Sequence, residues 1–113
     1  MKKLKNLTKT ALRITTAEGD VLIPSEGNAF VSTALEQQSM ISGVPIMTKR
    51  HIEIFGLPEK ENNVYLLVTS PVAIAADELG RGAEDLLVPS GKIIEDGKIK
   101  KFSYLEKLRR GGR

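Results

Sequence analysis

Apolar and polar positions along the chain alternate in short runs, a pattern that predicts β-strands. Residues 12–15 alternate strictly, and residues 21–23 return after the turn at Glu18-Gly19-Asp20, which indicates a hairpin. Residues 28–34 repeat the alternation. Turn signals recur every 8–15 residues, a spacing typical of a β-rich domain.

Further along the chain, three more segments extend this pattern. Residues 64–68 are almost continuously apolar, which predicts a central strand buried on both faces. Residues 44–54 are extended but contain Pro45, so we expect an edge strand. Residues 36–43 are polar and turn-rich. The dipeptide Asp96-Gly97 predicts a second hairpin between residues 92–95 and 98–102.

One helix has clear boundary signals. Ser70 can cap its start, Pro71 suits the first turn, and Gly80 can adopt the left-handed conformation that ends a helix. These residues predict a short helix over residues 71–79. The segment 104–110 is interpreted as a second, frayed helix.

The predicted class is therefore mainly β, that is a β-rich α+β fold. We expect a small antiparallel sheet or barrel-like domain of about six to eight short strands, with one helix near residues 71–79. A chain of 113 residues fits a single domain, which we assign to residues 1–107, followed by a flexible basic tail over residues 108–113. Without cysteine, the chain forms no disulfide or thiolate metal site.

Charge is unevenly distributed along the chain. Residues 1–13 and residues 92–113 each carry +5, whereas residues 14–91 carry −7. Basic ends that meet would form a patch suited to a polyanion; the alternative is that they serve solubility. The few, scattered aromatic residues argue against nucleic-acid binding. No apolar run approaches a membrane span or a signal peptide, so we expect a cytosolic protein with no membrane contact.

Candidate chemistry is sparse. No nucleophile motif and no phosphate-binding loop is present, and we expect no catalytic residue, metal or cofactor. His51 and Glu53 would share one face of an extended strand, as an oriented base requires. Arg81 lies between two glycines and can either bind an anion or form a salt bridge to Asp77, Glu78 or Asp85, which we favour. The candidate ligand-binding residues are Arg50, His51, Ser70, Arg81 and Asp85.

Short motifs in a fixed order resemble a family of small, uncharacterised proteins from bacteriophages and prophages. The motifs are Asn6-Leu7-Thr8, Gly56-Leu57-Pro58, Tyr65-Leu66-Leu67-Val68-Thr69-Ser70 and Arg81…Asp85…Pro89. The chain departs from the family pattern at Lys9-Thr10, where the family has Pro-His, and at Asp85, which is four residues after Arg81 rather than two. The resemblance implies a phage-type protein that acts in the host cytoplasm on a host component, such as a defence protein or a nucleotide immune signal.

Three functions are compatible with these features. The leading hypothesis is a non-enzymatic, homo-oligomeric binding protein that sequesters a small anionic nucleotide-derived ligand, a counter-defence sponge. The second is a protein–protein interaction module, either an inhibitor of a host defence protein or a minor virion component, in which the edge strand at residues 44–54 pairs with a partner strand. The third is a small hydrolase that uses His51 and Glu53.

Overall fold

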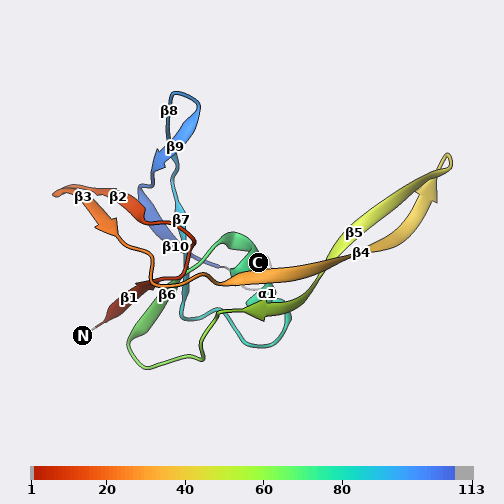
Figure 1. Cartoon of the computed structure of the whole chain (residues 1–113), viewed down its shortest axis with the longest axis horizontal. Coiled ribbons are helices and arrows are strands. Elements are labelled where there is room, and N and C mark those ends of the chain that lie inside the picture. The colour runs from red at the N-terminus through yellow and green to blue at the C-terminus, as the bar shows by residue number, and fades with distance from the viewer. Residues whose placement is uncertain (1, 109–113) are drawn as a thin grey trace.

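A computed structural model describes residues 2–108 and confirms a mainly β protein with one short helix (Figure 1). Between these residues the chain forms ten strands and one helix, more strands than the six to eight expected. The elements are β1 (Lys3–Asn6), β2 (Leu12–Thr16), β3 (Gly19–Ile23), β4 (Phe30–Ile41), β5 (Val44–Phe55), β6 (Val64–Leu67), α1 (Ser70–Glu78), β7 (Leu86–Ser90), β8 (Ile93–Glu95), β9 (Lys98–Lys101) and β10 (Tyr104–Lys107).

The body is built on a four-stranded mixed sheet in the order β1-β6-β7-β10. β6 runs parallel to both β1 and β7, and only β10 is antiparallel to its neighbour. The expected antiparallel or barrel-like sheet is therefore wrong in its strand directions. The reason is local: α1 connects β6 to β7, and a helical crossover returns the chain so that the next strand is parallel.

The core lies where α1 packs against this sheet. The predicted central strand is confirmed, since Leu66, Leu67 and Val68 are almost fully buried. α1 buries small side chains, among them Ala73 and Ala76, so its backbone approaches the sheet closely. Burying each large apolar side chain contributes about 1.5–3 kcal/mol.

Three two-stranded hairpins leave this body (Figure 1). The β2–β3 and β8–β9 hairpins confirm the two predicted from turn dipeptides. The third, β4–β5, has twelve residues in each strand and extends away from the body. We call it the arm. Its base packs against α1, and the rings of Phe30 and Phe55 stack there at a centroid distance of 5.2 Å.

Two predicted segments need correction. Residues 36–43 are not a loop: β4 continues to Ile41 and turns at Ser42-Gly43. The predicted frayed helix at 104–110 is strand β10 where the structure describes it, because residues 104–107 pair with β7.

The helix begins at Ser70 rather than after it. Thr69 holds the N-cap position, and no side chain there bonds the helix start. Gly80 does adopt a positive φ of 87°, as predicted.

The described chain ends at Leu108. Leu108 packs against the core cluster. Residues 109–113, most of the predicted basic tail at 108–113, lie outside the described residues. Within residues 2–108, no helix is both long and apolar enough to cross a membrane.

Candidate functional site

The five residues predicted to bind a ligand do not converge on one site. Arg81 and Asp85 lie together after α1, whereas Ser70 lies at the opposite end of that helix. Arg50 and His51 lie on the arm. Ser70 is therefore separated from Arg81 and Asp85 by the length of α1, whereas His51 reaches the same end of the helix as Arg81 through Glu78.

Arg81 forms the salt bridge that the sequence favoured. Its two terminal nitrogens meet the two carboxylate oxygens of Asp85 at 2.5 and 3.0 Å. Nη2 also donates to the backbone oxygen of Pro58 at 2.7 Å, and both side chains of the pair are largely buried. The guanidinium therefore holds the loop after α1 against the Gly56-Leu57-Pro58 turn. The flanking glycines predicted a freely placed arginine, but Arg81 has this structural role.

His51 has a different carboxylate partner from the one predicted. Its Nδ1 lies 2.6 Å from Oε1 of Glu78, in the last turn of α1. The predicted pairing with Glu53 fails because β5 has a bulge: Thr33 opposes His51 while Ser32 opposes Glu53, which leaves Ile52 as an extra residue. The bulge breaks the alternation that would have placed His51 and Glu53 on one face.

Arg50 and Ser70 also have defined surroundings. Arg50 forms an exposed pair with Glu36 on the neighbouring strand of the arm, with Nε 2.6 Å from Oε1. Ser70 lines a cavity of about 700 Å³, which we call the groove. Within residues 2–108, neither residue forms a hydrogen bond or an ion pair with Arg81 or Asp85.

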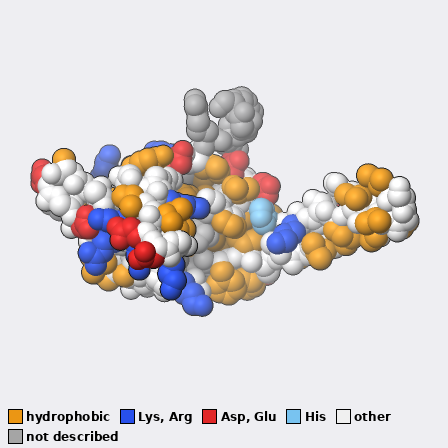
Figure 2. All heavy atoms as spheres, turned by 90° about the horizontal axis from the view of Figure 1, so that it is seen from above, with side chains coloured by type: hydrophobic (Ala, Val, Ile, Leu, Met, Phe, Trp, Pro, Cys, Tyr) orange, Lys and Arg blue, Asp and Glu red, His pale blue; other side chains and the backbone are white. Residues whose placement is uncertain are grey.

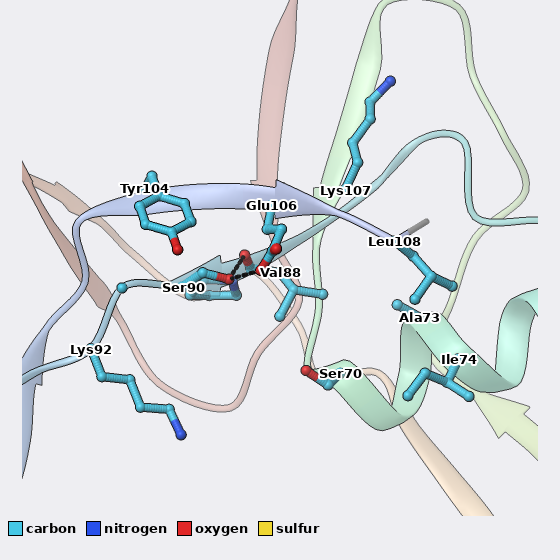
Figure 3. A pocket seen from close by; sticks show the side chains of 12 residues that line it. Ser70, Ala73, Ile74, Val88, Ser90, Lys92, Tyr104, Glu106, Lys107 and Leu108 are labelled. Carbon is cyan, nitrogen blue, oxygen red and sulfur yellow. Dashed lines mark hydrogen bonds between the residues drawn. The ribbon is translucent and has the colours of Figure 1, made fainter. Parts of the chain in front are cut away.

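The groove lies between α1, β7 and β10 (Figure 3). Tyr104 of β10 lies over one end, and Leu108, Ala73 and Ile74 line the other end. Its floor is apolar, with Val88 at the centre. Polar side chains ring it: Ser70, Ser90, Lys92, Glu106 and Lys107. This combination can hold an apolar group while Lys92 at the rim donates hydrogen bonds.

The strongest surface feature is the far half of the arm, residues 37–47, which we call the arm tip. Every residue of the arm tip is exposed and none is charged. Five large apolar side chains there are between 36% and 63% exposed: Met40, Ile41, Val44, Ile46 and Met47. Figure 2 shows apolar side chains over the end of the arm, with charged ones gathered nearer the body.

Both faces of the arm tip are apolar. Cross-strand partners share a face, so Ile41 lies with Val44, and Ile46 follows two residues on along β5. Met40 and Met47 lie on the opposite face. A hairpin that packs on a surface with one face needs only that face to be apolar. Two apolar faces therefore indicate that a binding partner would cover the tip on both sides.

The edges of the tip do not favour strand addition. Ser42 and Gly43 have φ angles of 51° and 78°, which form the two-residue turn with two positive φ values that suits a hairpin. In such a hairpin, the next cross-strand pair after Ile41 and Val44 is Met40 and Pro45. The backbone N–H and C=O positions of this pair point away from the partner strand. Proline has no N–H, so the outer edge of β5 lacks a donor there. Recognition by side chains is therefore favoured over the predicted β-pairing along residues 44–54.

From the sequence, residues 44–54 were predicted as an interaction segment, but residues 37–43 were not. The polar residues Gln37, Gln38, Ser39 and Ser42 suggested a loop and masked the alternation around them. Two signals were present: the absence of charge from residue 37 to 48, and a Ser-Gly pair flanked by Ile41 and Val44.

Other polar groups offer no metal site within residues 2–108, where no three histidine or carboxylate side chains converge. The pKa of Asp20 is lowered below its ordinary 3.8, chiefly by the hydrogen bond from Thr15, while partial desolvation opposes this and Lys101 and Arg13 assist it. Asp20 lies on the β2–β3 hairpin and stabilises that hairpin.

Residues that carry the resemblance to the phage family have structural roles. Asn6 is completely buried. Its amide nitrogen donates to the backbone oxygens of Thr10 and Ile23 at 3.0 Å each. Its side-chain oxygen accepts from the N–H and the hydroxyl of Thr8. The Asn-Leu-Thr motif therefore fixes the chain between β1 and β2.

No protein-family model, curated protein or solved structure matches this chain. The resemblance to phage proteins stays a prediction that rests on the short motifs alone.

Proposed function

We propose that this protein is a non-enzymatic assembly protein that binds another protein chain through the arm tip. The observation that carries the proposal is the tip itself: eleven consecutive exposed residues without a charge, apolar on both faces. Of the three functions predicted from sequence, this is the interaction module, with side-chain burial in place of strand pairing. The host cytoplasm is the compartment that the resemblance implies for it.

Energetics support a covered tip. An isolated two-stranded hairpin is at best marginally stable in water, and ordering each residue costs about 1–2 kcal/mol in backbone entropy. The tip gains little burial within its own chain to offset this cost, because its large apolar side chains stay 36–63% exposed. Protein surfaces protect exposed strand pairs with charges or covering loops. The arm tip has neither, which favours a partner that covers it.

The chemistry of the tip favours protein over a charged partner. A polyanion or a nucleotide is held by cations, and residues 37–48 contain none. Sequestration of an anionic ligand remains the alternative that the sequence predicts. Arg81 does not support this alternative, because its guanidinium already binds Asp85 and the Pro58 carbonyl.

The test is site-specific photo-crosslinking in cells that produce the protein. A photoreactive phenylalanine analogue replaces Ile41 at the arm tip or, as a matched control, Ala17 in the exposed turn of the β2–β3 hairpin. We expect a discrete protein crosslink from position 41 and none from position 17. Absence of any protein crosslink from position 41, or equal crosslinks from both hairpins, contradicts the proposal.

A further inference from the structure

We propose that the partner of the arm tip is a second copy of this chain, and that the tip is received in the groove between α1, β7 and β10 of that copy. The inference rests on the proposed function, because it assumes that the tip binds protein. It adds the identity of the partner and the place of contact. The protein then assembles head to tail.

The groove and the arm tip are chemically matched. The groove offers an apolar floor at Ala73, Ile74 and Val88, and the tip offers uncharged apolar side chains on two faces. An open groove of about 700 Å³ that is lined by both α1 and β10 can contact two faces of a narrow hairpin, which a flat surface cannot do. Lys92 at the rim can donate to carbonyls on the outer edges of the hairpin, which pairing inside the arm leaves open, whereas the ammonium of Lys107 lies over the Tyr65 ring.

The arm cannot fill the groove of its own chain. Its base is held by the stacked Phe30 and Phe55 rings and by the contact between His51 and Glu78. From this base the arm extends away from the body (Figures 1 and 2). A tip that seats in a groove must therefore use the groove of another molecule.

Charge does not prevent this contact. Each chain carries a net +3, which opposes close approach of two bodies, but the arm tip carries no charge and can enter the groove of a second copy without adding to that repulsion. A partner selected for its acidity would instead contact the basic ends. Every copy brings one tip and one groove, so the contact is of the head-to-tail type and produces a ring or an open filament.

Complementation between two disabled chains tests this arrangement. The tip variant is Ile41→Lys with Val44→Glu, a cross-strand pair of opposite charges that suits the hairpin. The groove variant is Ile74→Glu; Tyr104→Lys is a second, independent one. All four positions are exposed, so substitution there leaves folding nearly unchanged. Circular dichroism and urea unfolding check this for each full-length variant, and light scattering gives the mass in solution.

The expected pattern is specific to head-to-tail contact. The wild-type chain should give a mass of several chains, and each variant alone should give the mass of one. An equal mixture of tip and groove variants should form a dimer, because the mixture contains one intact tip and one intact groove. A control mixture of Ile74→Glu with Tyr104→Lys, in which no groove is intact, should stay monomeric.

Two results overturn the inference, and each differs from failure of the proposed function. A wild-type chain that stays monomeric at high concentration excludes a second copy, even where position 41 crosslinks to a different protein. Groove variants that assemble like wild type, while the tip variant does not, place the contact elsewhere, as in direct tip-to-tip packing. Loss of every protein crosslink from position 41 instead removes the proposed function itself.

Discussion

Nδ1 of His51 and Oε1 of Glu78 lie 2.6 Å apart and join the base of the arm to the last turn of α1. His51 is the residue of β5 that precedes the bulge at Ile52, so the bulge and the hydrogen bond act at the same point. A bulge bends its strand and increases its local twist. The pair therefore stabilises the direction in which the arm leaves the body.

Glu78→Ala should loosen this base without unfolding the protein. Because the carboxylate is more than half exposed, we expect a loss of only about 0.5–1 kcal/mol in the free energy of unfolding. Backbone order parameters from NMR relaxation should fall along β4 and β5 and stay unchanged in β6. Glu36→Ala, which removes a pair inside the arm, is the control. Unchanged order in the arm of Glu78→Ala would show that the hydrogen bond has no orienting role.

Arg81 and Asp85 should contribute more to stability than any exposed pair of the chain. Asp85→Asn leaves the guanidinium largely buried without its counter-charge, so we expect a loss of about 2–4 kcal/mol. Arg81→Lys keeps the charge but loses the two-pronged contact, at a cost of about 1–3 kcal/mol. Urea unfolding measures both.

The exposed pair of Arg50 and Glu36 supplies the matched control. Arg50→Lys should change stability by less than about 0.5 kcal/mol. Equal effects of Arg81→Lys and Arg50→Lys would contradict a clamping role for Arg81.

Substitution of Gly56 should destabilise the protein for two reasons, and only one of them applies to Gly97. Both have a φ of 76°, where a side chain costs about 1–2 kcal/mol. A Cβ at Gly56 would also lie 2.5 Å from the backbone oxygen of Asn28, whereas Gly97 faces open space. Gly56→Ala should therefore destabilise the protein by about 1–3 kcal/mol more than Gly97→Ala. Thermal unfolding of the two variants gives the comparison, and equal melting temperatures would argue against the close approach.

Asp20 should make part of the stability depend on acid pH. Its pKa is lowered in the folded state, chiefly by the Thr15 hydroxyl. A lowered pKa stabilises the fold above the ordinary value of 3.8, and this stabilisation is lost as the pH falls through the folded-state pKa. Thr15→Val should move the pKa of Asp20 back toward its ordinary value.

Carboxyl-carbon NMR titration of Asp20 follows this shift directly. Thr16→Val serves as the control, because the Thr16 hydroxyl bonds the Gly19 carbonyl and the Glu18 N–H rather than Asp20. An equal shift in both variants would remove Thr15 as the main cause.

Local signals in the sequence predicted those elements whose structure is decided locally. Asp96-Gly97 specified its hairpin, the apolar run at residues 64–68 specified the central strand, and Gly80 marked the end of the helix. A salt bridge of Arg81 was predicted with Asp77, Glu78 or Asp85, which all lie within four residues of it, and the partner in the structure is Asp85.

Features decided by distant contacts were missed. The lysine-rich segment at β1 is a strand because β6 lies beside it, and residues 104–107 are a strand because β7 offers an edge. The predicted partner of His51 was wrong, because no pattern in the sequence indicated the bulge at Ile52. The arm tip was taken for a loop because its polar side chains hid an alternating pattern.

Hydrogen exchange of the arm tip at different protein concentrations tests most directly whether it is a covered contact between copies. We expect the backbone amides of residues 37–44, 46 and 47 to exchange quickly in dilute solution and to become protected as the concentration rises. The β2–β3 hairpin, which takes no part in the contact, should exchange at the same rate throughout. Equal, fast exchange of the tip at every concentration would contradict a tip buried in a second copy.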